Sequence, residues 1–247
     1  MPERRRTPIH IEVIEPEHCT PAMRRQILSE VSFFAGLSDD EIESVDRRAR
    51  SVGFRAGEEV YREGAPASQL FIVATGVVKT TRLTTEGVAV ATGLLGPGDF
   101  CGALPALGHE TYQDGARALS GACLLAFGTA DFDWVLARHS SVARAALTAV
   151  SQRLASTQET LFQRGGSTEQ RTAAVLLSLA EKLGVRRRHG VLVHTPLSRE
   201  DLAALVGART ETVSRILSRW KRDGLVETGR RWVAVIDDDA LAELAAL

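Results

Sequence analysis

The stretch GARTETVSRILSRW, residues 207–220, places ionisable side chains one helical turn apart. Its apolar residues recur at helical spacing and are Val213, Ile216, Leu217 and Trp220. Glu211, Ser214 and Arg215 fall on the other side of such a helix. Arginine can donate two bonds to guanine O6 and N7, and glutamate can accept one from cytosine N4. The same spacing also suits a solvent-facing ion pair, so the neighbouring elements must decide between the two interpretations.

Those neighbours predict a winged helix-turn-helix. A helix with Ser198 as N-cap and Gly207 as terminator precedes the stretch, and an arginine-rich hairpin with its turn at Thr228-Gly229 follows it. Six apolar residues are expected to lock the two helices together: Leu202, Leu205, Val206, Val213, Ile216 and Leu217.

The polar face of the second helix is the predicted DNA-reading surface. A recognition helix meets base edges with its N-terminal residues, and this helix is expected to start around Arg209–Thr210. Glu211, Ser214 and Arg215 are therefore the predicted base readers, with an (i, i+4) bond ordering Glu211 against Arg215. The other predicted DNA contacts, chiefly to phosphate, are Arg199, Arg209, Thr210, Thr212, Arg219, Lys221, Arg230 and Arg231.

Charge distribution supports a polyanionic partner. The whole chain of 247 residues has a net charge of −1, yet residues 205–231 carry seven basic and three acidic residues, a local +4. A local basic face suits a phosphate backbone, although charge clustering alone also fits a solvated surface. No apolar run approaches the length of a membrane span and no secretory signal is present, so a cytoplasmic protein without a membrane partner is expected.

In the rest of the chain the predicted secondary structure changes from helix to short strands and then back to helix. Residues 37–49 predict a helix capped by Ser38, and residues 51–127 contain short strands punctuated by glycines, as in a sandwich or rolled barrel. Residues 140–164 predict a long helix with a narrow stripe of small apolar residues. That stripe favours a dimer seam; packing of the helix on the barrel is the alternative.

The motifs TETVSRIL, LSREDLAALVG and RDGLVE, with the GDFCG-containing β region, resemble the cAMP-receptor-protein/fumarate-nitrate-regulator (CRP/FNR) family over residues 33–236. The resemblance implies an α+β protein with a cyclic-nucleotide-binding-like β-roll, a long dimerisation helix and a C-terminal winged helix-turn-helix. The implied parts are an arm (1–29), the β-roll sensor (30–138), the dimerisation helix (139–165) and the DNA-binding domain (166–247). Ser214 resembles the FNR branch, which favours inverted repeats of the type TTGAT-N4-ATCAA, whereas Arg209 departs from both patterns.

The same resemblance predicts which signals the β-roll does not take. Members that bind cAMP carry a glutamate where this chain has Ala103, and an Arg-Ser pair near the present Tyr112–Gln113. A buried phosphate without a cationic partner is costly, so cAMP is not the expected effector. An iron–sulfur cluster needs four thiolates, but the arm holds only Cys19. A four-iron cluster is therefore not expected either.

Haem chemistry, thiol chemistry, a small apolar or acidic metabolite and no ligand at all stay open at this stage. His18 and Cys19 in the arm are candidate haem ligands, and Cys101, His109 and Arg117 are candidate effector-pocket residues. Three cysteines at positions 19, 101 and 123 are widely separated, so no disulfide framework is expected. A thiol switch at Cys101 or Cys123 is a further alternative.

The sequence therefore predicts a homodimeric transcription regulator that binds a palindromic operator in double-stranded DNA and acts on RNA polymerase. Its signal is expected to differ from cAMP, with haem, gas or redox chemistry as candidates. The alternative is a sensor in which haem or thiol chemistry is the primary function. An enzyme is not predicted, because no nucleophile–base pair, phosphate loop or HExxH motif is present.

Overall fold

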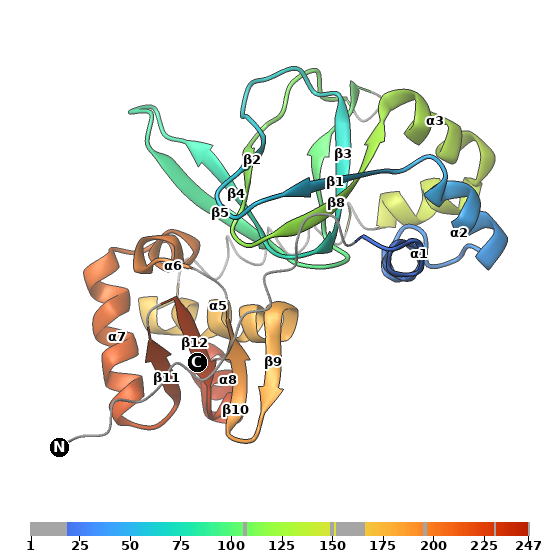
Figure 1. The fold of residues 1–247 in the computed structure, drawn as a ribbon. Helices are drawn as coiled ribbons and strands as arrows, with labels where there is room; N and C mark the ends of the chain where they lie inside the picture. The colour runs from blue at the N-terminus through green and yellow to red at the C-terminus, as the bar shows by residue number, and fades with distance from the viewer. Residues whose placement is uncertain are drawn as a thin grey trace.

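The computed structural model describes residues 19–105, 108–148, 151, 166–194, 197–229 and 231–246. A β-roll with flanking helices forms the first part, and a smaller α/β domain, residues 166–246, forms the second (Figure 1). Within these ranges no helix is long and apolar enough to cross a bilayer.

The β-roll consists of two four-stranded antiparallel sheets. The first has the order β1-β8-β3-β6 and the second β2-β7-β4-β5. The strands are β1 (Arg50–Phe54), β2 (Glu59–Tyr61), β3 (Gln69–Thr75), β4 (Val78–Leu83), β5 (Ala89–Leu95), β6 (Phe100–Ala103), β7 (Gly115–Ala118) and β8 (Ala122–Gly128). The predicted run of short strands between glycines is confirmed.

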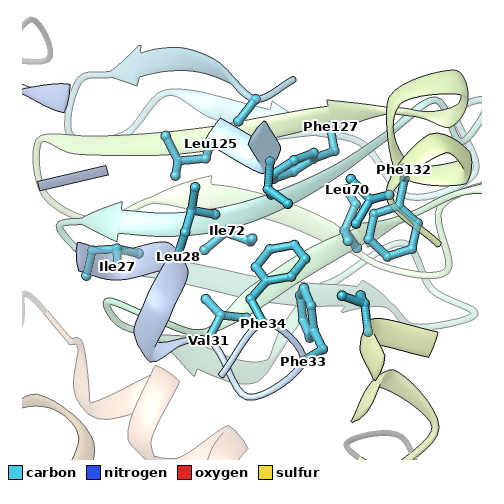
Figure 2. Close-up of a cluster of buried hydrophobic side chains, with 14 of the residues drawn as sticks. Ile27, Leu28, Val31, Phe33, Phe34, Leu70, Ile72, Leu125, Phe127 and Phe132 are labelled. Carbon is cyan, nitrogen blue, oxygen red and sulfur yellow. The ribbon is translucent and has the colours of Figure 1, made fainter. Parts of the chain in front are cut away.

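Strand β3 is buried on both faces of its sheet. Because successive side chains of a strand point to opposite sides of the sheet, β3 contributes to two different cores. Phe71 and Val73 enter the core between the two sheets, whereas Leu70 and Ile72 enter a second core under the helices. Helices α1 (Pro21–Glu30), α2 (Asp39–Asp46) and α3 (Thr129–Arg138) surround that second core. Figure 2 shows its aromatic centre, with Phe33, Phe34, Phe127 and Phe132 turned toward one another.

A disulfide joins the start of α1 to the first sheet. Cys19 and Cys123 are bonded, with Cα atoms 6.2 Å apart and a sequence separation of 104. The expectation that the cysteines form no disulfide is therefore wrong. Separation along the sequence does not predict the distance between the two cysteines in space. Cys123 lies in β8, and Cys19 packs against the core that β8 shares with α1, so the fold brings the two side chains together. Cys101 is not disulfide-bonded and is buried.

The C-terminal domain has one antiparallel sheet of order β11-β12-β10-β9, with α5 packed against it and α8 packed on α5 (Figure 1). Its elements are α5 (Thr168–Leu183), β9 (Gly184–Arg187), β10 (Gly190–Val193), α6 (Arg199–Val206), α7 (Thr210–Arg222), β11 (Val226–Gly229), β12 (Trp232–Val235) and α8 (Asp238–Ala246). One apolar cluster joins α5, α6, α7, α8 and the sheet.

The N-caps predicted at Ser38 and Ser198 depend on local chemistry and are confirmed, whereas the helix predicted over residues 37–49 already ends at Asp46. Ser38, Ser167 and Ser198 each accept a bond from the N3 amide and form a capping box. The hairpin turn predicted at Thr228-Gly229 is wrong: Gly229 still belongs to β11 and pairs with Trp232, so the turn lies beyond Gly229 and includes Arg231. Arg231 adopts φ +64° there, in the left-handed region that an arginine enters only at a cost.

The predicted dimerisation helix is described only in its first part. Residues 140–148 are helical, with Val142 buried in the core beneath α3 and Leu147 68% exposed. The predicted seam at residues 149–150 and from residue 152 onward lies outside the described residues.

Candidate nucleic-acid interface

Helices α6 and α7 meet at a tight turn that only a few residue types allow. Gly207 has φ +68° and ψ +45° and ends α6 in the left-handed conformation, which glycine adopts without a Cβ penalty. The Ala208 amide donates to the Ala203 carbonyl and closes the turn. Helix α7 then begins at Thr210 with Arg209 as N-cap, as the sequence predicts.

The apolar side of α7 fixes the helix in the domain. Its buried residues are Val213, Ile216, Leu217 and Trp220. The same cluster contains Leu202 and Val206 of α6, with Leu205 partly buried against it, so the predicted lock between the helices is confirmed. Trp220 is 1% exposed and its indole Nε1 donates to Glu169 of α5 at 3.0 Å. This bond satisfies the buried donor and sets the rotation of α7 about its axis.

The polar side of α7 faces solvent. Glu211, Thr212 and Arg215 are exposed and Ser214 is half-buried. A groove of about 570 Å³ follows this face and is lined by Thr212, Ser214, Arg215, Ile216, Ser218, Arg219 and Arg222. The exposed first turns thus combine a carboxylate, hydroxyls and guanidinium groups in one surface.

The predicted bond between Glu211 and Arg215 is wrong: within the described chain no ion pair joins them. Both side chains are exposed, where water screening leaves an (i, i+4) pair only a few tenths of a kcal/mol, about the entropy cost of holding two long side chains. Both groups are consequently open to an external partner.

The other predicted DNA contacts differ in how accessible they are. Arg209 is exposed at the N-cap, Thr210 is half-buried behind it, and Arg231 is exposed in the wing turn. Arg219 forms an ion pair with Glu169, and Lys221 donates to the Thr228 carbonyl. Arg230 lies outside the described residues.

Arg199 opens α6 and is half-buried. Burial lowers the pKa of its guanidinium, because a low-dielectric environment disfavours the charged form. A phosphate near this helix N-terminus would offset that penalty.

The interior of the β-roll is filled rather than open at its aromatic centre. Tyr61 stacks on Tyr112 with ring centroids 4.2 Å apart and on Phe71 at 5.9 Å. The Tyr61 hydroxyl donates to Asp114 Oδ1 and accepts from the Gly102 amide, both at 2.9 Å. Burial raises the pKa of Tyr61, and the neighbouring Cys101 and Asp114 raise it further. We call Tyr61, Tyr112 and Phe71 the aromatic stack.

The predicted effector-pocket residues do not converge. Cys101 is buried in the core that contains the aromatic stack, whereas His109 is exposed. Arg117 is exposed and donates to the Gly57 carbonyl at 2.6 Å, with Glu59 at 3.8 Å, so it has structural partners at the rim of the roll.

The predicted haem ligands also separate. His18 lies outside the described residues, and the Cys19 sulfur is bonded to Cys123. The disulfide contradicts the prediction that Cys19 is a haem ligand in the oxidised protein, because Cys19 could supply a thiolate only after reduction of that bond.

Comparisons with known proteins agree with this arrangement. The cyclic nucleotide-binding domain family matches residues 51–139, and the Crp-like helix-turn-helix domain family matches residues 170–244. A CRP-like cAMP-activated global transcriptional regulator of Mycobacterium tuberculosis is 26% identical over 227 residues, covering 89% of this chain and 99% of the relative. The nitrogen fixation regulation protein FixK of Bradyrhizobium diazoefficiens is 25% identical over 213 residues, covering 86% and 89%.

Solved structures share the fold. FixK2 from Bradyrhizobium japonicum aligns with a TM-score of 0.71 over 81% of this chain and 98% of that chain, at 24% identity. TTHB099, a CRP-family regulator from Thermus thermophilus, aligns with a TM-score of 0.66 at 28% identity, over 79% and 97%. A cyclic-nucleotide-binding-type roll followed by a Crp-like helix-turn-helix defines a class of DNA-binding regulators. The chain belongs to the CRP/FNR family of transcriptional regulators, and its relatives are regulators rather than enzymes.

Sequence reasoning missed two features. The aromatic stack joins residues of β2 and β3 and the segment before β7, and no motif signals that Tyr61 and Asp114 meet. Contacts between the β-roll and α6 were also missed, because they join residues 122 positions apart.

Proposed function

We propose that this protein is a homodimeric transcription factor that inserts α7 of each protomer into the major groove of an inverted repeat. The observation that carries the proposal is the division of α7: Val213, Ile216 and Leu217 are buried, whereas Glu211 and Arg215 in its first turns are exposed and not joined to each other. Recognition helices present their N-terminal residues to base edges in this way.

The half-site TTGAT contains one G·C pair, and the two charged readers complement its two bases. Arg215 would donate to guanine O6 and N7, and Glu211 would accept from the cytosine amino group on the other strand. Ser214 lies between them and can contact either kind of base edge. This assignment supports an operator of the type TTGAT-N4-ATCAA.

Phosphate contacts would surround these readers and set the register of the protein on DNA. Arg209 at the start of α7 and Arg199 at the start of α6 lie near helix N-termini, where backbone amides favour anions. Thr210, Thr212, Arg219 and the wing residue Arg230 complete the proposed set.

A symmetric dimer would present two copies of α7 to the two half-sites. Support comes from Leu147, a large apolar side chain left 68% exposed on the helix that follows α3. We assign residues 139–165 to the dimerisation helix, residues 30–138 to the sensor and residues 166–247 to the DNA-binding domain, with 1–29 as the arm. The bound dimer would then recruit or block RNA polymerase.

The signal is proposed to be something other than cAMP. Ala103 replaces the family's glutamate, and the carboxylate of Asp114, held by Tyr61, lies directly after the Tyr112–Gln113 position expected for the Arg-Ser pair. A cyclic phosphate would meet a negative charge and an interior filled by the aromatic stack.

A redox signal is the second candidate, favoured by the Cys19–Cys123 disulfide. A dithiol reductant would transfer two electrons to the bond, leaving two cysteine thiols and an oxidised dithiol. Operator affinity of the oxidised protein, the reduced protein and the Cys19→Ser variant tests it. Equal affinities of all three would exclude this redox signal. Haem is tested by the absorption spectrum after addition of haemin.

The experiment for the main proposal is a fluorescence anisotropy titration of purified protein. A duplex containing the inverted repeat is compared with a duplex of scrambled sequence, and sedimentation gives the stoichiometry. We expect two chains per repeat and at least about 10³-fold tighter binding to the repeat. One chain per duplex, or equal affinity for both sequences, would overturn the proposal.

A further inference from the structure

The β-roll holds the DNA-binding domain through a small contact between strands β4 and β5 and helices α5 and α6. Figure 1 shows α6 beneath these strands. Lys79 Nζ of β4 lies 2.8 Å from Asp201 Oδ1 of α6, and both side chains are mostly buried, at 19% and 16% exposed. In a second ion pair the lysine is on the C-terminal domain and the carboxylate on the roll: Lys182 of α5 lies 3.6 Å from Asp99. We call these residues, with Leu94 and Gly96, the docking contact.

An apolar side chain sits beside the first ion pair. Leu94 of β5 is the direct cross-strand partner of Lys79, and paired residues of neighbouring strands project from the same face of a sheet. Leu94 is 6% exposed and belongs to the apolar cluster of the DNA-binding domain. One face of the β4–β5 pair thus supplies both a cation and an apolar anchor to the domain.

The two surfaces also approach closely at Gly96. A Cβ on Gly96 would lie 2.5 Å from Leu183 Cδ2 at the end of α5, so a larger residue would push the side chain of Leu183 away. The Gly96 amide donates to Asp99 Oδ2 at 3.1 Å, while Asp99 Oδ1 faces Lys182. The turn after β5 is therefore shaped to receive the end of α5.

Lys79 has no competing partner in the sheet. Its neighbour across the other strand is Arg117, which is directed to Gly57 and Glu59 instead. Asp201 is held ready on α6 by Ser198, whose hydroxyl and amide both bond its carboxylate. These bonds and the one from Lys79 outweigh the effect of burial and lower the pKa of Asp201, so it is charged at neutral pH.

We infer that Lys79 is a positioning residue for DNA recognition: it touches no base or phosphate, but it fixes the direction in which each protomer presents α7. The inference rests on the proposed function, because a palindromic operator requires two recognition helices at one fixed separation. When the docking contact opens, the domain samples other directions, and the apparent affinity falls by the fraction that stays competent.

The test uses Lys79→Met, which keeps the apolar stem and leaves the cap of α6 intact. Affinities are measured for the full inverted repeat and for a duplex with a single half-site. If only about one tenth of the Lys79→Met molecules keep the domain docked, binding to the repeat should be about tenfold weaker. Binding to the half-site should be unchanged. Hydrogen exchange of α6 amides without DNA should become faster. Lys79→Arg, which keeps the charge, should restore much of the affinity.

Lys182→Met is the matched control, because its pair is longer and more exposed and should lower affinity for the repeat less. Unchanged affinity and unchanged exchange in Lys79→Met would overturn the inference. Tighter binding, or equal losses on the repeat and the half-site, would also overturn it, since the contact would then be inhibitory or merely stabilising. Failure of the wild-type protein to bind the repeat would instead refute the proposed function, while the exchange measurement would still report on docking.

Discussion

On α7, the carboxylate of Glu211 and the guanidinium of Arg215 end in solvent. In the β-roll, the hydroxyl of Tyr61 ends against Asp114 and the amide of Gly102, both at 2.9 Å. The first region leaves its polar groups open, whereas the second pairs them internally. A surface that must exchange water for a ligand keeps its groups unpaired, and a core that must hold its shape satisfies them. The comparison therefore assigns recognition to α7 and rigidity to the centre of the roll.

The largest expected effect is on the roll. Reduction of Cys19–Cys123 opens a loop of 104 residues, so the free energy of unfolding should fall by about 4–5 kcal/mol through the greater entropy of the unfolded chain. Urea unfolding with and without reductant measures it. The Cys19→Ser variant is the control, because reductant should have no further effect on its stability. Equal stability of the oxidised and reduced wild-type protein would contradict the structural role of the bond.

A matched pair of hydroxyl deletions sharpens the comparison. Tyr61→Phe removes the hydroxyl that bonds both Asp114 and the Gly102 amide at a part-buried site and should cost about 1–3 kcal/mol of stability. Ser218→Ala removes an exposed hydroxyl of α7 that donates to the Ser214 carbonyl, and should stay within about 0.5 kcal/mol. Thermal unfolding of the two variants measures the difference, and similar losses would break the contrast between the regions.

The smallest expected effect is on the pH dependence of the docking contact. Asp201 has a lowered pKa in the folded protein, so its contribution is present above the unfolded pKa of about 4 and is lost as the pH falls through the folded pKa. The stability difference between wild type and Lys79→Met should thus be constant from pH 7 to about pH 5 and shrink below pH 4. A difference that instead disappears between pH 7 and pH 5 would show that another group controls the contact.

The sequence predicts those features that depend on neighbouring residues. Ser38, Ser167 and Ser198 cap their helices, and Gly207 ends α6, because capping needs only the local chain. The DNA-reading face follows from the spacing of Glu211, Ser214 and Arg215 together with the buried stripe opposite. Periodicity places those side chains, but it could not show that Glu211 and Arg215 stay apart.

The sequence could not predict features that join distant parts of the chain. The Cys19–Cys123 bond, the Tyr61–Asp114 bond and the Lys79–Asp201 pair each span tens of residues or more. Their formation depends on how α1 packs on the roll and on how the C-terminal domain docks against β4 and β5. Neither arrangement leaves a local signal in composition or spacing.

The most direct test of the account is a cycle between Arg215→Ala and replacement of the G·C pair by A·T in both half-sites of the operator. On the original operator, Arg215→Ala should cost about 1–3 kcal/mol of binding free energy per G·C contact. On the altered operator, where that contact is already lost, the same substitution should cause almost no further loss. If the two losses simply add, Arg215 does not read that base pair, and the proposed docking of α7 in the major groove would be contradicted.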